Sequence, residues 1–64
     1  MTMVEKFEEI FWQVGDENGV NEWYNIFDSD LFDVVRDRIV NEFGDDVLES
    51  DEFLDWYDEM CEDL

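Results

Sequence analysis

Residues 50–64 read SDEFLDWYDEMCEDL, and this stretch is the clearest amphipathic segment of the chain. Its apolar side chains recur every three or four residues, which is the period of one helix face. That face holds Phe53, Tyr57, Met60, Cys61 and Leu64, with Leu54 and Trp56 at its edges. The opposite face holds Asp51, Glu52, Asp55, Asp58, Glu59 and Glu62. With Ser50 as its N-cap, the segment is predicted to form a helix with one buried and one anionic side.

Two segments further toward the N-terminus show the same period. The first opens at Thr2, which is followed three residues later by a glutamate as in a capping box, and we expect it to end in the run 15–19. Its stripe is Met3, Val4, Phe7, Ile10, Phe11 and Val14. The second begins with Asp28 or Ser29 as N-cap and stops at Gly44. Its stripe is Leu31, Phe32, Val35, Ile39 and Phe43.

Residues 20–28 allow two interpretations. A short helix capped by Asn21 would place four apolar residues on one face: Val20, Trp23, Tyr24 and Phe27. The same aromatic residues would also suit a strand. Because no segment alternates strictly enough to require a strand, we predict an all-α fold. It is a compact bundle of three longer helices and one short helix, in a single acidic domain over residues 1–64.

The charge balance is extreme. The chain has 21 Asp and Glu against three Lys and Arg, and its net charge is −18. Solubility alone needs a net charge of only about 2–8 for a small domain, and self-repulsion of this size opposes compaction. Six Phe, three Trp and two Tyr distinguish the chain from a disordered acidic tail. We interpret the excess charge as functional, with a merely solvated or halophilic surface as the alternative.

The composition argues against catalysis and against a metal site. Histidine is absent, although nucleophile–base pairs usually need it. The charged residues close to Cys61 in the sequence are all acidic, and such residues do not activate a thiol. EF-hand spacing fails from both Asp16 and Asp28. A lone cysteine, no secretory signal and no apolar run of about 18 residues favour the cytoplasm. We therefore expect no enzyme activity, no cofactor, no metal and no membrane partner.

Carboxylates form a stripe along each of the three longer segments. In residues 50–64 they stand at Asp51, Asp55, Asp58 and Glu62, one per helical turn and about 5–6 Å apart, which is similar to the phosphates of one DNA strand. The other stripes are Asp30, Asp33 and Asp37, and Glu5, Glu8 and Glu9. Like charges one turn apart destabilise a helix. Their retention favours a surface that imitates the DNA backbone for a basic groove.

Two apolar features fall outside the stripes. Trp12 points away from its helix stripe toward Glu5 and Glu8, and tryptophan is a frequent anchor of protein interfaces. Packing under the loop at 15–20 is the equal alternative for this side chain. Val34 and Val40 also leave their stripe, which suggests a homodimer.

In size, acidity and aromatic content the chain resembles the small phage-encoded DNA-mimic inhibitors. These include anti-restriction proteins, anti-CRISPR proteins, inhibitors of uracil-DNA glycosylase and inhibitors of host nucleoid proteins. The resemblance is one of character, without a shared motif. It implies an inhibitor of a basic nucleic-acid-binding protein, with a CRISPR effector as the preferred target, in the cytoplasm of an infected bacterium and without direct nucleic-acid binding. Trp12 or Trp56 would then add affinity as a stacked base does.

A second, local resemblance concerns Asp28-Ser29-Asp30-Leu31. It looks like the Asp-Ser-Leu of acyl carrier proteins, an acidic four-helix family whose serine carries phosphopantetheine. Asp30 interrupts that triplet, and Ser29 is more simply an N-cap. The alternatives to a DNA mimic are therefore an acyl-carrier-like protein modified at Ser29 and an acidic protein–protein adaptor that binds through its apolar faces.

Overall fold

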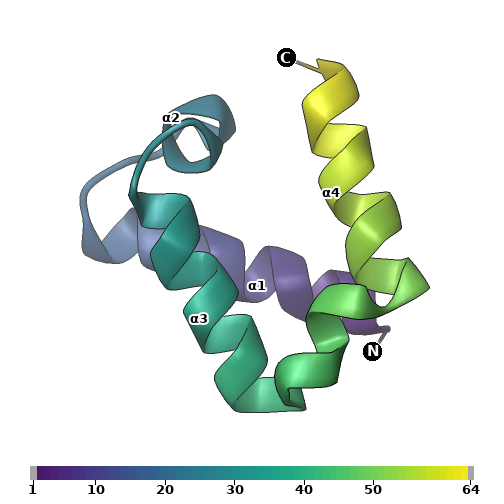
Figure 1. Ribbon diagram of the computed structural model, residues 1–64. Coiled ribbons are helices and arrows are strands. Elements are labelled where there is room, and N and C mark those ends of the chain that lie inside the picture. The colour runs from purple at the N-terminus through teal and green to yellow at the C-terminus, as the bar shows by residue number, and fades with distance from the viewer. Residues whose placement is uncertain (1, 64) are drawn as a thin grey trace.

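The computed structural model describes residues 2–63, which form a bundle of helices (Figure 1). The elements are α1 (Met3–Glu17), α2 (Trp23–Phe27), α3 (Leu31–Phe43), the 3-10 helix η1 (Asp45–Glu49) and α4 (Asp51–Asp63). None of the described residues lies in a strand. The predicted all-α fold of three longer helices and one short helix is confirmed, and the segment 20–28 contains the short helix rather than a strand.

Helix α1 begins as predicted and ends within the predicted run 15–19. The Thr2 hydroxyl accepts a hydrogen bond from the backbone N–H of Glu5 at 3.2 Å. The helix then continues through Gly15 to Glu17. Gly19 reverses the chain with a φ of 72°, and the N–H of Val20 donates to the carbonyl of Gly15 at 2.8 Å. A left-handed glycine followed by a hydrogen bond that spans five residues is the Schellman motif of a helix C-terminus.

Val20, Trp23 and Phe27 pack against the core as predicted, but two other predicted details of α2 were wrong. Glu22, not Asn21, is the N-cap, and its side chain makes no capping bond. Ile26, which was absent from the predicted face, is completely buried, whereas Tyr24 is 48% exposed. The reason lies in α1, because Gly15 has no side chain and Ile26 fills the space where one would stand.

The start of α3 also differs from the prediction. Its N-cap is Asp30, whose side chain makes no capping bond. Ser29 instead closes the turn between α2 and α3: its hydroxyl donates to the carbonyl of Ile26 at 3.1 Å and accepts from the N–H of Leu31 at 3.3 Å. The end of α3 at Gly44 is confirmed, and this glycine has a φ of 101°.

The segment between Gly44 and Ser50 is a 3-10 helix that the periodicity did not predict. This element places Val47 in the core at 4% exposure. The predicted cap of α4 is confirmed, since the Ser50 hydroxyl accepts from the N–H of Phe53 at 3.3 Å. The 3-10 helix η1 and the capping residue Ser50 thus connect α3 to α4 (Figure 1).

The buried face of α4 is rotated from the predicted one. Trp56, expected at the edge, is only 4% exposed, and Cys61, expected on the buried face, is exposed. The cause is the packing of α4 on α1, where the Trp56 ring lies 5.4 Å from Phe7 and 5.9 Å from Phe11 between ring centroids. Leu64 lies outside the described residues.

The core is built from aromatic rings on α1, α3 and α4. Phe7 is fully buried and meets Phe43, Phe53 and Trp56 at centroid distances of 5.4–5.7 Å. Helix α1 is therefore the central element and packs against α2, α3 and α4. No polar or charged side chain among the described residues is buried, so every charge of residues 2–63 lies at least partly at the surface.

Candidate binding surface

The outer face of α4, defined by Asp51, Asp55, Asp58 and Glu62, is fully anionic. All four side chains are exposed, because Phe53 and Trp56 turn the opposite side of the helix into the core. Glu52 and Glu59 are exposed beside them. Helix α4 has 13 residues and spans about 20 Å at 1.5 Å per residue. Helix α4 carries seven carboxylates in all, including those beside its outer face. On average they lie about 3 Å apart along the helix axis, compared with about 3.4 Å for the phosphates of one DNA strand.

The predicted stripes of α3 and α1 also lie on the surface. Asp30, Asp33 and Asp37 are exposed on α3, opposite the side that carries the buried Val35 and Ile39. Glu5, Glu8 and Glu9 are exposed on α1. The structure therefore places every acidic residue of the predicted site where a partner can reach it. Two of these carboxylates are partly neutralised by a cation.

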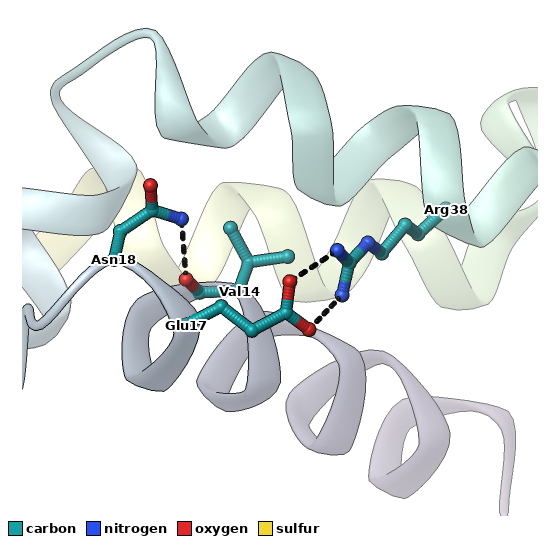
Figure 2. A network of polar contacts seen from close by, with 4 residues as sticks. All are labelled: Val14, Glu17, Asn18 and Arg38. Atoms are coloured by element: carbon teal, nitrogen blue, oxygen red, sulfur yellow. Dashed lines mark hydrogen bonds and ion pairs between the residues drawn. The ribbon is translucent and has the colours of Figure 1, made fainter.

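The three cationic side chains of the chain are all engaged. Lys6 lies 3.8 Å from Glu9, and Arg36 lies 3.1 Å from Asp33. Arg38 binds both carboxylate oxygens of Glu17, at 2.5 and 2.6 Å (Figure 2). Within residues 2–63, the outer face of α4 has no ion pair, so its charge is unopposed.

The Arg38–Glu17 pair joins two helices that are distant in sequence. Figure 2 shows Arg38 reaching from α3 to the last turn of α1. Its hydrogen bonds lower the pKa of the Glu17 carboxyl and raise the pKa of the Arg38 guanidinium. Beside the pair, the side-chain amide of Asn18 donates to the carbonyl of Val14 at 2.8 Å. These contacts fix the end of α1, and none of them involves the outer face of α4.

The charge of the whole molecule can be compared with DNA through its size. The principal extents are 28 × 25 × 22 Å, and the net charge is −18. Duplex DNA carries one charge per roughly 1.7 Å of axis, which is about 16 charges over the same 28 Å. The molecule and a duplex segment of its length therefore carry nearly the same charge.

A cavity of about 230 Å³ between α1, α2 and α4 brings the three tryptophans of the chain together. Trp12 lines it from α1, Trp23 from α2 and Trp56 from α4. Trp12 is 45% exposed, which agrees with its predicted orientation toward Glu8, another lining residue. Trp56, the other tryptophan predicted to stack on a partner, also lines the cavity but is only 4% exposed, so Trp12 is the more accessible of the two.

The sequence missed the other members of this cavity. Trp23, Met60 and Asp63 line it together with Glu59, from two helices that are far apart along the chain. Their proximity follows from the way α2 and α4 pack against α1, which no periodicity within one helix reveals. The only signal in the sequence was the acidic neighbourhood of each tryptophan.

The remaining predicted features lie elsewhere. Val34 is 40% exposed, whereas Val40 is half-buried against the core, so the two valines do not share one free face. In residues 2–63 no group of three acidic or cysteine side chains is arranged to hold a metal ion. None of the helices in this range is long and apolar enough to cross a membrane.

Comparison of the chain with protein-family models, with curated proteins and with solved structures gave no match. The case for a function therefore depends on charge, exposure and cavity geometry.

Proposed function

We propose that this protein is not an enzyme but a DNA mimic, which inhibits a nucleic-acid-binding protein by occupying its basic groove. The observation that carries this proposal is the match of charge to length. A net charge of −18 within 28 Å is close to the roughly 16 charges of a duplex segment of the same length. Few ordinary soluble domains need such a density.

The outer face of α4 is the surface that imitates the phosphates. The seven carboxylates of α4 together have about the linear density of one DNA strand. The four on its outer face are exposed, and no lysine or arginine among the described residues pairs with them. A basic groove that binds this face gains the same long-range attraction that draws it to DNA. The stripe of α3 (Asp30, Asp33 and Asp37) would extend the track.

The chemistry of the target follows from that of the mimic. A groove lined by Lys and Arg is common to CRISPR effectors, restriction enzymes, repair glycosylases and nucleoid proteins, and a bacterial defence effector in the cytoplasm of an infected cell is the preferred target. The protein itself would not bind nucleic acid, because two polyanions repel each other. An acidic adaptor would instead bind through apolar side chains and would depend little on salt. An acyl-carrier-like protein would gain the mass of phosphopantetheine on Ser29.

The proposal is tested by capture and competition. The protein is immobilised and exposed to a bacterial lysate, bound proteins are eluted with excess duplex DNA, and the eluate is identified by mass spectrometry. The DNA binding of the captured protein is then measured with and without the mimic, at several salt concentrations. We expect stoichiometric inhibition that weakens steeply as salt rises.

A pair of variants locates the contact. The triple reversal Asp55→Lys, Asp58→Lys and Glu62→Lys replaces three of the four carboxylates on the outer face of α4 with ammonium groups. The matched control Glu42→Lys, Asp45→Lys and Asp46→Lys makes the same charge change at exposed positions in the last turn of α3 and in η1. We expect the first variant to lose inhibition and the control to keep most of it, with unchanged helicity in both. Equal inhibition by the two variants would exclude the outer face of α4 as the mimic surface.

A further inference from the structure

The cavity that contains the three tryptophans has the features of a site for a planar organic cation. Trp56 and Phe11 are 4% and 2% exposed and form its floor, whereas Trp12 and the half-buried Trp23 form its walls. The Phe11 ring stands perpendicular to both neighbours, at 5.5 Å and 88° to Trp12 and at 5.9 Å and 90° to Trp56. These edge-to-face contacts hold the indole rings in place.

The rim of the cavity is anionic. Glu8 of α1 and Glu59 and Asp63 of α4 line it, and all three side chains are exposed. Among residues 2–63 none of the three belongs to an ion pair, and the cavity lining contains no lysine or arginine. Aromatic faces and free carboxylates both attract a cation, so the charge of the cavity is complementary to a positively charged group.

The volume of the cavity and its aromatic lining restrict the chemical class of the group that it can bind. A volume of about 230 Å³ is below the range of about 300–1,000 Å³ that pockets for drug-sized ligands occupy, so a single side chain suits it better. Among the described residues the carboxylates are not arranged to hold a metal ion, and the indole rings offer it no ligand. A guanidinium is flat, stacks on aromatic faces and has five donors for surrounding carboxylates, whereas an ammonium is compact and more strongly hydrated.

We infer that this cavity receives an arginine side chain of the partner protein, with its guanidinium stacked on Trp12 or Trp23 and bonded to Glu8, Glu59 or Asp63. The inference rests on the proposed function, and it extends the imitation of nucleic acid from phosphates to bases. Arginine planes stack on unpaired bases and bond to phosphates in nucleic-acid complexes. Here the indole takes the place of the base and the carboxylate that of the phosphate.

The test uses the full chain and a small probe, without any partner protein. All three tryptophans line this cavity, so intrinsic tryptophan fluorescence and the indole N–H signals in NMR report on it directly. The chain is titrated with N-acetyl-arginine amide, N-acetyl-lysine amide and N-acetyl-citrulline amide. Citrulline has nearly the shape of arginine but no charge, and lysine has the charge without the plane.

We expect saturable shifts of the indole signals with the arginine probe, at least several-fold weaker binding of the lysine probe, and no saturation with the citrulline probe. Trp12→Leu, at a 45% exposed position, should lower the arginine affinity about tenfold. Glu8→Gln with Glu59→Gln should lower it too, whereas the matched neutralisation Asp55→Asn with Asp58→Asn on the outer face of α4 should have a much smaller effect. Thermal unfolding followed by circular dichroism establishes that each variant folds.

Two outcomes would overturn the inference: equal affinity for arginine and lysine probes, or an equal loss of affinity in the cavity and outer-face variants. Either result would mean that the cations only gather around a polyanion. Because the titration contains no partner, its failure is distinct from that of the DNA-mimic proposal, which depends on capture and inhibition. An intact inhibitor whose cavity ignores arginine would overturn this inference alone.

Discussion

Gly15→Ala is the substitution that most directly tests how the helices pack. Gly15 lies in the last turns of α1, where α2 and the turn that precedes it pack closely against the helix. A Cβ atom placed there would stand 2.3 Å from Cδ1 of Ile26 and 2.8 Å from the backbone carbonyl oxygen of Val20. The first contact can be relieved by a rotation of the Ile26 side chain. The second involves backbone and cannot be relieved without moving the turn after α1.

The size of the effect follows from two opposing terms. Alanine in a helix interior is favoured over glycine by about 0.8–1 kcal/mol. Overpacking of a core costs about 1–3 kcal/mol, and the backbone contact places this site in the upper part of that range. We expect a net loss of about 1–2 kcal/mol, which corresponds to a fall of about 5–15 °C in the thermal midpoint of a domain of this size.

The assay is thermal unfolding followed by circular dichroism at one salt concentration. Gln13→Ala, on an exposed position of the same helix, is the control for helix propensity and should change the midpoint little. Ile26→Val alone should cost about 0.5–1.5 kcal/mol. In its presence Gly15→Ala should cost less than alone, because Cδ1 is gone. A midpoint of Gly15→Ala at or above that of the parent chain would refute the close contact of α1 with α2.

Two further predictions concern charge. The thermal midpoint of the parent chain should rise as sodium chloride increases from about 0.01 to 1 M, because screening shortens the range of repulsion among the carboxylates from about 30 to 3 Å; a midpoint indifferent to salt in calorimetry would contradict the crowding of these charges. The contribution of the Glu17–Arg38 pair to stability should depend on pH. The hydrogen bonds from Arg38 lower the pKa of Glu17 from its usual 4.5. The pair therefore stabilises the fold above pH 4.5, and this stabilisation is lost as the pH falls through the lowered pKa. Arg38→Gln should therefore lower the midpoint at neutral pH but not in strong acid, and NMR titration should show a higher Glu17 pKa in this variant; a difference that persists unchanged in acid would argue against the pair.

Several features that depend on one helix alone were predictable from the sequence, although the N-caps of α2 and α3 were not. The capping residues Thr2 and Ser50 and the stop at Gly44 are where the pattern placed them, because each acts on backbone groups within four residues. The exposure of the acidic stripes was predictable for the same reason. A helix that buries its apolar face must turn the residues opposite to it toward solvent.

The features that depend on contact between helices were not predictable. Ile26 is buried because Gly15 leaves room for it, and Trp56 is buried because α4 is rotated toward Phe7 and Phe11. The pairing of Glu17 with Arg38 joins residues 21 positions apart. Such contacts are set by the crossing of helices and the volumes of their side chains, which periodicity does not encode.

The acidic surface and the tryptophan cavity illustrate this division. The sequence by itself determined that the chain is helical and that its carboxylates face solvent, since solvation of charge and burial of apolar faces are properties of each helix. Only the tertiary structure decided that Trp12, Trp23 and Trp56 share one cavity with unpaired carboxylates at its rim. The tryptophans belong to three different helices, and only the packing of α2 and α4 on α1 brings them together.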